Sequence, residues 1–129
     1  MSNDAAVSLT QEHQDFFERF KSFWNAPTGP RVAELIAPEA NIQFSGAGIF
    51  SGADYVHVMG EMLATMDDIK VTPLDCAGHG ERLYIAWEAT ATIDGDQRAW
   101  MGVDRFLIRD GMAIEEQVIF DSALLQPQS

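Results

Sequence analysis

The stretch Gln97–Asp121, QRAWMGVDRFLIRDGMAIEEQVIFD, decides the fold of this chain. Its two halves are rich in aromatic and β-branched residues, and Arg109, Asp110 and Gly111 between them favour a tight turn. This pattern predicts a β-hairpin. Side chains alternate between the two faces of a strand, so the first strand has a face that is apolar except for one carboxylate. That face consists of Trp100, Gly102, Asp104, Phe106 and Ile108.

Two aspartates of this hairpin are candidates for chemistry. Asp104 stands on the apolar face of the first strand, and Asp121 follows a Val-Ile-Phe run at the end of the second. An ionised carboxylate beside apolar side chains is costly to desolvate, so each must reach solvent, find a partner or serve a cavity. Alternation divides the second strand into Glu115, Gln117, Ile119 and Asp121 on one face and Ile114, Glu116, Val118 and Phe120 on the other.

Composition places the chain among globular proteins of one domain. It has 129 residues, of which 47% are hydrophobic and 22% are charged. The formal net charge of −12 repels phosphate backbones and anionic lipids, so neither nucleic acid nor a membrane is expected as a partner. The sequence has no long apolar run, no basic and apolar start typical of a secretory signal, and a single cysteine, Cys76. These features predict a cytoplasmic protein.

The first half of the chain predicts helices. Apolar residues at three- and four-residue spacings indicate an amphipathic helix over residues 9–25, with Thr10 as its N-cap and His13 on its polar face. A short second helix over residues 31–36 cannot continue through Pro38. A strand over residues 41–44, a glycine-containing bend and a third helix over residues 53–66 follow.

The second half predicts four strands separated by turn sequences, at residues 69–77, 82–93, 97–109 and 112–120. Three helices followed by an antiparallel meander indicate an α+β fold in which the helices cover one face of the sheet. We expect a single domain over residues 9–122, a flexible tail at 1–8 and a C-terminal tail at 123–129.

This order of elements resembles the nuclear transport factor two-like superfamily, and within it the SnoaL-like polyketide cyclases and ketosteroid-isomerase-like domains. The resemblance rests on the element order together with APEAN at 37–41, DGMAI at 110–114 and the terminal IFD at 119–121. It implies a cone-shaped, curved, mixed sheet covered by three N-terminal helices around an apolar pocket. It also implies a homodimer formed through the outer face of the sheet. Because this fold carries many different functions, the resemblance does not determine the activity, which depends on the residues of the site.

The resemblance carries over only some catalytic residues. Ketosteroid isomerases have an aspartic base where this chain has Phe44, and an oxyanion-holding tyrosine on a first helix that here offers only Phe16, Phe17, Phe20 and Trp24. Their second pocket acid matches Asp104, and the acid/base aspartate of SnoaL-like cyclases matches Asp121. Relatives similar to limonene-epoxide hydrolase use an Asp-Arg-Asp set, but Arg105 is expected to face away from Asp104.

These residues predict a cofactor-independent enzyme that transfers protons on an apolar cyclic carbonyl compound, as an isomerase, cyclase or dehydratase. Asp104 and Asp121 are the predicted catalytic residues, provided that both open onto one cavity. No histidine pair has the spacing of metal ligands, so neither a metal nor another cofactor is expected. The predicted substrate-binding residues are Phe20, Trp24, Tyr55, His57, Met59, Trp87, Trp100, Phe106 and Gln117.

The same residues also allow interpretations without catalysis. Asp104 could pair with Arg82 or Arg98, and Asp121 could be a solvated strand end. His57 could be a boundary residue of its helix. The chain could then be a ligand-binding or dimerisation module without chemistry, and an epoxide hydrolase is a further alternative.

Overall fold

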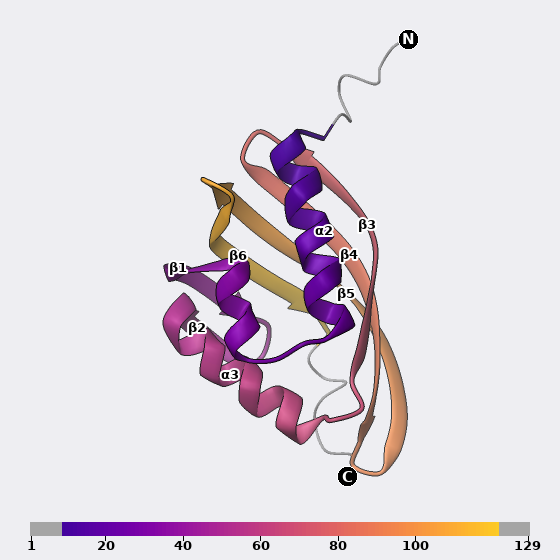
Figure 1. Cartoon of the computed structure of the whole chain (residues 1–129). Coiled ribbons are helices and arrows are strands. Elements are labelled where there is room, and N and C mark those ends of the chain that lie inside the picture. Colours follow the sequence, from indigo (N-terminus) through magenta and orange to yellow (C-terminus); the bar gives the residue numbers. More distant parts are fainter. Residues whose placement is uncertain (1–8, 122–129) are drawn as a thin grey trace.

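One six-stranded sheet forms the framework of the protein. The computed structural model describes residues 9–121, so Ser122 and the tails predicted at 1–8 and 123–129 lie outside the described residues. The strand order is β2-β1-β6-β5-β4-β3, which leaves β2 and β3 as open edges of a curved sheet (Figure 1). The strands are β1 (Ile36–Phe44), β2 (Gly48–Ser51), β3 (Lys70–His79), β4 (Arg82–Ile93), β5 (Asp96–Arg109) and β6 (Met112–Phe120).

Strands β3 to β6 form the antiparallel meander predicted from the sequence. The β4–β5 and β5–β6 turns have positive φ at both central residues, 54° and 82° at Asp94 and Gly95 and 55° and 79° at Asp110 and Gly111. This conformation is typical of two-residue hairpin turns, because its twist matches that of the flanking strands. Strand β1 pairs in parallel with β6, so the sheet is mixed.

A one-residue bulge decides which side chains of β6 face the helices. Ile108 pairs with Ala113, whereas Leu107 pairs with Glu115, so Ile114 has no residue directly opposite it. Beyond the bulge, each β5 residue faces a β6 residue one position later than in a regular hairpin. Because side chains alternate along a strand, this shift exchanges the inner and outer faces of β6.

Within residues 9–121, two α-helices and one 3₁₀ helix precede the meander, namely α2 (Gln11–Asn25), η1 (Pro30–Glu34) and α3 (Gly52–Thr65). The expectation of three α-helices is therefore wrong for the second one. A 3₁₀ turn of this length has poor hydrogen-bond geometry, and the chain becomes extended at Ile36, which pairs with Ala113 of β6. The predicted bend after Phe44 is instead a hairpin turn, since β2 pairs antiparallel with β1.

The helices lie on one face of the sheet and bury its apolar side chains (Figure 1). Phe16 and Phe20 of α2 meet Phe106 of β5 edge to face, with ring centroids 4.8 and 5.9 Å apart. Buried and more exposed side chains alternate along β4, as expected for a strand with one buried face. Its buried residues are Leu83, Ile85, Trp87, Ala89 and Ala91.

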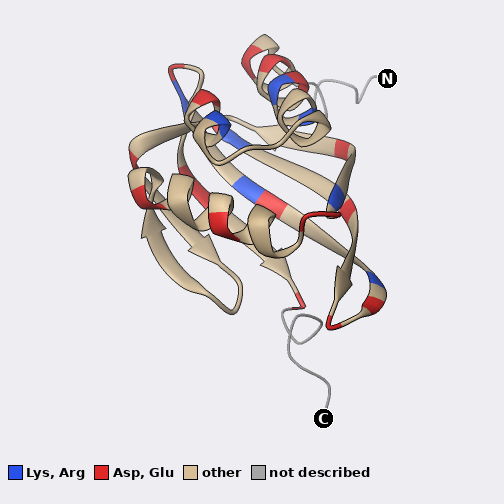
Figure 2. Ribbon diagram, turned by 60° about the horizontal axis from the view of Figure 1, so that its bottom comes forward, with Lys and Arg blue, Asp and Glu red and all other residues tan. Residues whose placement is uncertain are grey.

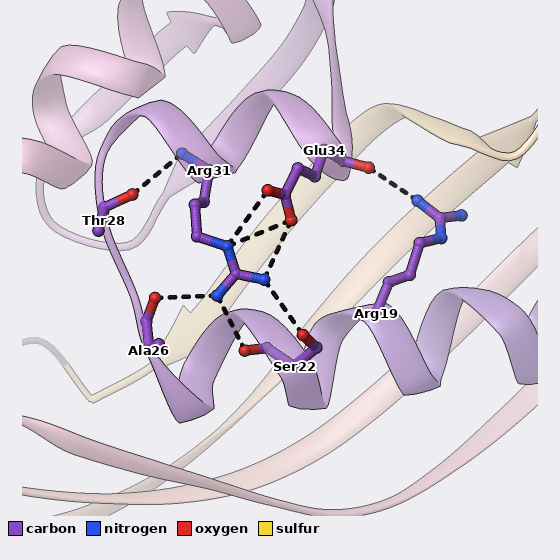
Figure 3. Close-up of polar contacts among 6 residues, drawn as sticks. All are labelled: Arg19, Ser22, Ala26, Thr28, Arg31 and Glu34. Atoms are coloured by element: carbon purple, nitrogen blue, oxygen red, sulfur yellow. Dashed lines mark hydrogen bonds and ion pairs between the residues drawn. The ribbon is translucent and has the colours of Figure 1, made fainter.

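Arg31 fastens η1 to the end of α2 (Figure 3). Its guanidinium donates hydrogen bonds to the carbonyls of Ser22 and Ala26, at 3.0 and 2.9 Å, and forms an ion pair with Glu34 at 3.1 Å. The last turn of α2 contains no basic residue of its own. Arg31 therefore supplies the positive charge that a helix C-terminus favours and satisfies carbonyls that have no partner within the helix.

His13 is buried, which corrects the expectation that it lies on the polar face of the first helix. Thr10 caps the helix as predicted, and Nδ1 of His13 accepts a 3.2 Å hydrogen bond from the Thr10 backbone in place of the glutamate of a capping box. Nε2 lies 2.8 Å from the carbonyl oxygen of Gly80. His13 therefore joins the start of α2 to the β3–β4 turn.

Acidic residues are spread over the molecule and outnumber the basic ones (Figure 2). Helix α3 contains Asp54 and Glu61 but no lysine or arginine. No helix within residues 9–121 is both long and apolar enough to cross a membrane.

Candidate active site

A cavity lies between the helices and the inner face of the sheet. It offers about 70 Å³ to the centre of a water-sized sphere, several times what one water molecule needs. Its walls come from α2, η1, α3 and every strand except β2. The lining residues are Phe20, Phe23, Trp24, Val32, Ile36, Phe44, Tyr55, Met59, Met62, Met66, Ile69, Val71, Trp87, Ala89, Trp100, Asp104, Glu116, Val118 and Phe120.

Asp104 occupies the sheet side of this cavity. It is 5% exposed, and its Oδ1 accepts a 3.0 Å hydrogen bond from the indole nitrogen of Trp87 on the neighbouring strand. The Trp87 ring reaches Asp104 across Gly102, its cross-strand partner. A Cβ at position 102 would overlap ring atoms of Trp87 and would lie 2.8 Å from the carbonyl oxygen of Ile119. Glycine at this position is therefore what allows the indole to orient the carboxylate.

Glu116 of β6 is the second acid of the cavity. It is 6% exposed and shares a side-chain hydrogen bond with Asp104. Burial raises the pKa of Asp104 to about 6, although the hydrogen bonds from Glu116 and Trp87 oppose this shift. Burial raises the pKa of Glu116 well above its usual value, and the nearby charge of Asp104 and their hydrogen bond raise it further. Both shifts favour the protonated carboxyl, and Glu116, whose pKa the charge of Asp104 raises further, is the member of the pair that holds a proton more readily.

Tyr55 of α3 completes the polar part of the cavity. Its side chain is buried, and burial raises the pKa of its phenol well above the usual value, with smaller contributions from the charges of Glu116 and Asp104. The phenol is therefore neutral at physiological pH. A neutral hydroxyl beside two carboxyl groups can donate a hydrogen bond to an oxygen atom that gains negative charge.

Most of the predicted binding residues line the cavity. Six do so directly, namely Phe20, Trp24, Tyr55, Met59, Trp87 and Trp100. Phe106 is buried among Phe16 and Phe20 but does not line the cavity. His57 is exposed on α3, because it is two residues from the inward Tyr55 and a helix turns by more than half a circle over two residues.

Asp121 and Gln117 are not brought together with Asp104. Asp121 is exposed just after the end of β6, and Gln117 is half-buried on the outer face of the sheet, opposite Arg105. A regular hairpin would have placed Gln117 opposite Asp104, on the same face as Asp121. The bulge at Ile114 places Val118 there instead.

Glu116 was missed as a site residue in the sequence, although a signal for it exists. It shares a strand face with Val118 and Phe120, two residues apolar enough to be core. A carboxylate on an apolar strand face indicates a candidate site residue, and Asp104 was identified in the same way from its position between Trp100 and Phe106. The same bulge that removes Asp121 from the cavity brings Glu116 into it.

Two arrangements considered from the sequence are missing around this cavity. None of its lining residues is an arginine, and Arg105 lies against the ring of Tyr84, 6.0 Å from the centroid. No arginine among the lining residues therefore bridges two aspartates as in epoxide hydrolases of this fold. Arg82 pairs with Glu115 rather than with Asp104. Within the same residues, no three histidine, cysteine or acidic side chains gather as metal ligands would.

Known structures share this fold at low sequence identity. An NTF2-like protein of unknown function from Burkholderia pseudomallei has a TM-score of 0.78 and 17% identity, over 88% of this chain and 94% of that one. IdmH, a proposed polyketide cyclase from Streptomyces antibioticus, has a TM-score of 0.75 and 19% identity, over 90% and 96%. A proposed SnoaL-like polyketide cyclase from Jannaschia sp. has a TM-score of 0.76 and 13% identity, over 99% of both chains.

The comparison of sequences agrees with the comparison of folds. No curated protein shows significant similarity to the chain. The family model of the SnoaL-like domain, however, matches residues 17–116, which include most of the cavity walls, Asp104 and Glu116. The chain therefore belongs to the SnoaL-like domain family.

Proposed function

We propose that this protein is a cofactor-independent enzyme that moves protons on an apolar, cyclic carbonyl compound held in the cavity. The observation that carries the proposal is the buried pair of Asp104 and Glu116, which are hydrogen-bonded to each other at the wall of an otherwise apolar cavity. When their surroundings give two acids different pKa values, one can act as the general base and the other as the general acid. Isomerisation, ring closure and dehydration all use this division.

In the proposed reaction, the carboxylate of Asp104 removes a proton from the carbon next to the carbonyl group. The electron pair of that C–H bond forms a carbon–carbon double bond, and negative charge develops on the carbonyl oxygen. The Tyr55 hydroxyl and the carboxyl proton of Glu116 are the donors available to that oxygen. Once Asp104 has become neutral, it no longer holds the Glu116 proton as strongly, so Glu116 becomes a better donor at the moment the charge appears.

Exchange of carbon-bound protons tests this proposal without knowledge of the natural substrate. A panel of cyclic ketones and enones is incubated with the protein in deuterated water, and loss of the proton signals next to the carbonyl is followed by NMR. We expect Asp104→Asn and Glu116→Gln each to slow exchange by about 10²–10⁴-fold, the usual contribution of a general acid or base. Glu115→Gln is the matched control, because Glu115 is the exposed neighbour on the other face of β6.

Unchanged exchange in the Asp104→Asn protein would contradict the proposal. If no ketone of the panel exchanges but several bind, the ligand-binding module without chemistry becomes the better description.

We also propose that a second copy of the chain packs on the outer face of the sheet. Apolar side chains are exposed there on neighbouring strands, with Met101 63% and Ile119 44% exposed, and Val103 of the same strand as Met101 pairs with Ile119. Since each copy carries a net charge of −12, their association requires an apolar contact of this kind. Sedimentation should give a dimer for the native protein and a monomer for Met101→Glu; a native monomer would exclude this interface.

A further inference from the structure

The cavity contains a negative charge that no basic side chain of its walls balances. None of the nineteen lining residues is a lysine, arginine or histidine. The partners that orient the Asp104 carboxylate are the Trp87 indole and the Glu116 carboxyl, and neither can carry a positive charge. Buried carboxylates are normally paired with a cation, because an isolated charge is costly in an apolar environment.

The walls around this carboxylate are those of an aromatic cage. Eight rings line the cavity, those of Phe20, Phe23, Trp24, Phe44, Tyr55, Trp87, Trp100 and Phe120. The faces of aromatic rings are electron-rich and attract cations, most strongly at tryptophan, and such cages are used to bind quaternary ammonium groups. All three tryptophans of the chain belong to this set.

The hydrogen-bonding capacity of Asp104 and Glu116 also favours a cationic ligand. Before any reaction, the hydrogen bond between Glu116 and Asp104 engages the carboxyl proton of the pair, so the remaining oxygen lone pairs of both groups accept hydrogen bonds from a ligand. The protein as a whole is acidic, and α3, which covers the cavity, contains no lysine or arginine. An acidic surface raises the local concentration of cations and lowers that of anions.

We propose that the ligand of this cavity carries a positively charged nitrogen, as an amine or ammonium group attached to an apolar ring. The aromatic walls enclose the ring and the charged nitrogen, and the Asp104 carboxylate, whose charge no lining residue balances, is the counter-ion of that nitrogen. This inference rests on the proposed function for the choice of site, and it narrows the substrate to a cyclic carbonyl compound that bears a basic nitrogen. Anionic compounds are excluded from the same space.

Two probes of equal shape and different charge test the inference. Benzyltrimethylammonium is positively charged at every pH, and 2,2-dimethylpropylbenzene is its neutral isostere. Binding is followed by tryptophan fluorescence, since every tryptophan lines the cavity. At pH 8 we expect the cation to bind at least about tenfold more tightly than the isostere, as cation–aromatic and ion-pair contacts in a desolvated site allow.

A double variant removes the charge of the cavity. Asp104→Asn combined with Glu116→Gln should lower the cation preference and leave only the part that the aromatic rings supply, whereas the control pair Asp121→Asn and Glu115→Gln removes the same number of acids from exposed positions and should leave it unchanged. Circular dichroism establishes that both variants are folded. A tighter complex of the native protein with the neutral isostere, or a cation preference that is the same in the double variant, would overturn the inference.

The pH dependence of the native protein gives a second test that needs no variant. The titratable groups facing Asp104 are Glu116 from β6 and Tyr55 from α3, and both stay uncharged near neutral pH; α2 contributes only Phe20, Phe23 and Trp24. As Asp104 takes up a proton, affinity for the cation should fall below about pH 6 and level off at the value of the double variant, while affinity for the isostere stays constant. A pH-independent preference would contradict the inference.

The binding experiment and the exchange experiment test the ligand class and the proposed chemistry independently. A protein that prefers the cation but exchanges no ketone proton refutes the proposed chemistry and leaves the ligand class standing. A protein that exchanges ketone protons but has no preference for the cation refutes the ligand class alone.

Discussion

Replacing Asp104 by asparagine should make the protein more stable at neutral pH, although it removes the proposed base. Asparagine keeps the shape of the side chain, and its carbonyl oxygen can still accept the hydrogen bond from Trp87. The change removes a carboxylate that folding buries without a cation. Residues that serve a reaction often reduce stability in this way.

The size of the effect follows from the pKa of Asp104, which is raised from 3.8 to about 6 by burial. A group whose pKa is raised on folding contributes stability that is fully present below its unfolded value, and this contribution is lost as the pH rises through the folded value. Two pH units correspond to about 3 kcal/mol. The Asp104→Asn protein should therefore match the native protein near pH 4 and exceed its free energy of unfolding by up to about 3 kcal/mol at pH 8.

Urea denaturation at a series of pH values measures this difference. Groups that titrate alike in both proteins cancel, so only the difference between the two curves is interpreted. For a domain of this size the gain corresponds to about 10 °C in the midpoint of thermal unfolding at pH 8. A variant less stable than the native protein at pH 8, or a difference that does not change between pH 4 and 8, would refute the reasoning.

Three further substitutions test the surroundings of the cavity. Gly102→Ala should cost about 1–3 kcal/mol in urea denaturation, because the new methyl group displaces the Trp87 ring. Arg31→Lys should cost about 1–2 kcal/mol at the same assay, since lysine cannot reach the carbonyls of Ser22 and Ala26 and pair with Glu34 at once. His13→Phe should cost about 1–3 kcal/mol, as the Gly80 carbonyl and the Thr10 backbone N–H lose their partner. Losses below about 0.5 kcal/mol would contradict these assignments.

Much of the fold could be predicted because its signals are local. The Asp94-Gly95 and Asp110-Gly111 turns and the alternation in β4 and β5 identify the meander, and spacings of three and four residues identify α2 and α3. Six of the predicted binding residues line the cavity for the same reason, since large inward aromatic residues of a small fold form its walls. The start of β1 at Ile36 was not evident, because its first residues are ordered by pairing with β6, far along the chain.

The position of the second acid relative to Asp104 depends on a bulge that local signals do not reveal. The bulge at Ile114 lies in a stretch whose alternation looks regular, and nothing in its sequence marks the extra residue. A shift of one position is enough to move Asp121 and Gln117 away from the cavity and Glu116 into it. The burial of His13 was missed because its partner at Gly80 is distant in sequence, and helix periodicity alone does not show which polar residue is buried.

The central claim is that Asp104 and Glu116 hold a single proton between them. Carbon-13 NMR of labelled aspartate and glutamate side chains measures this directly, because the carboxyl carbon shifts on ionisation. At pH 7.5 we predict one protonated glutamate whose signal is absent in Glu116→Gln and present in Glu115→Gln, and an aspartate that titrates near pH 6 and is absent in Asp104→Asn. Spectra in which every glutamate is ionised at pH 7.5 and every aspartate titrates near 4 would contradict the claim.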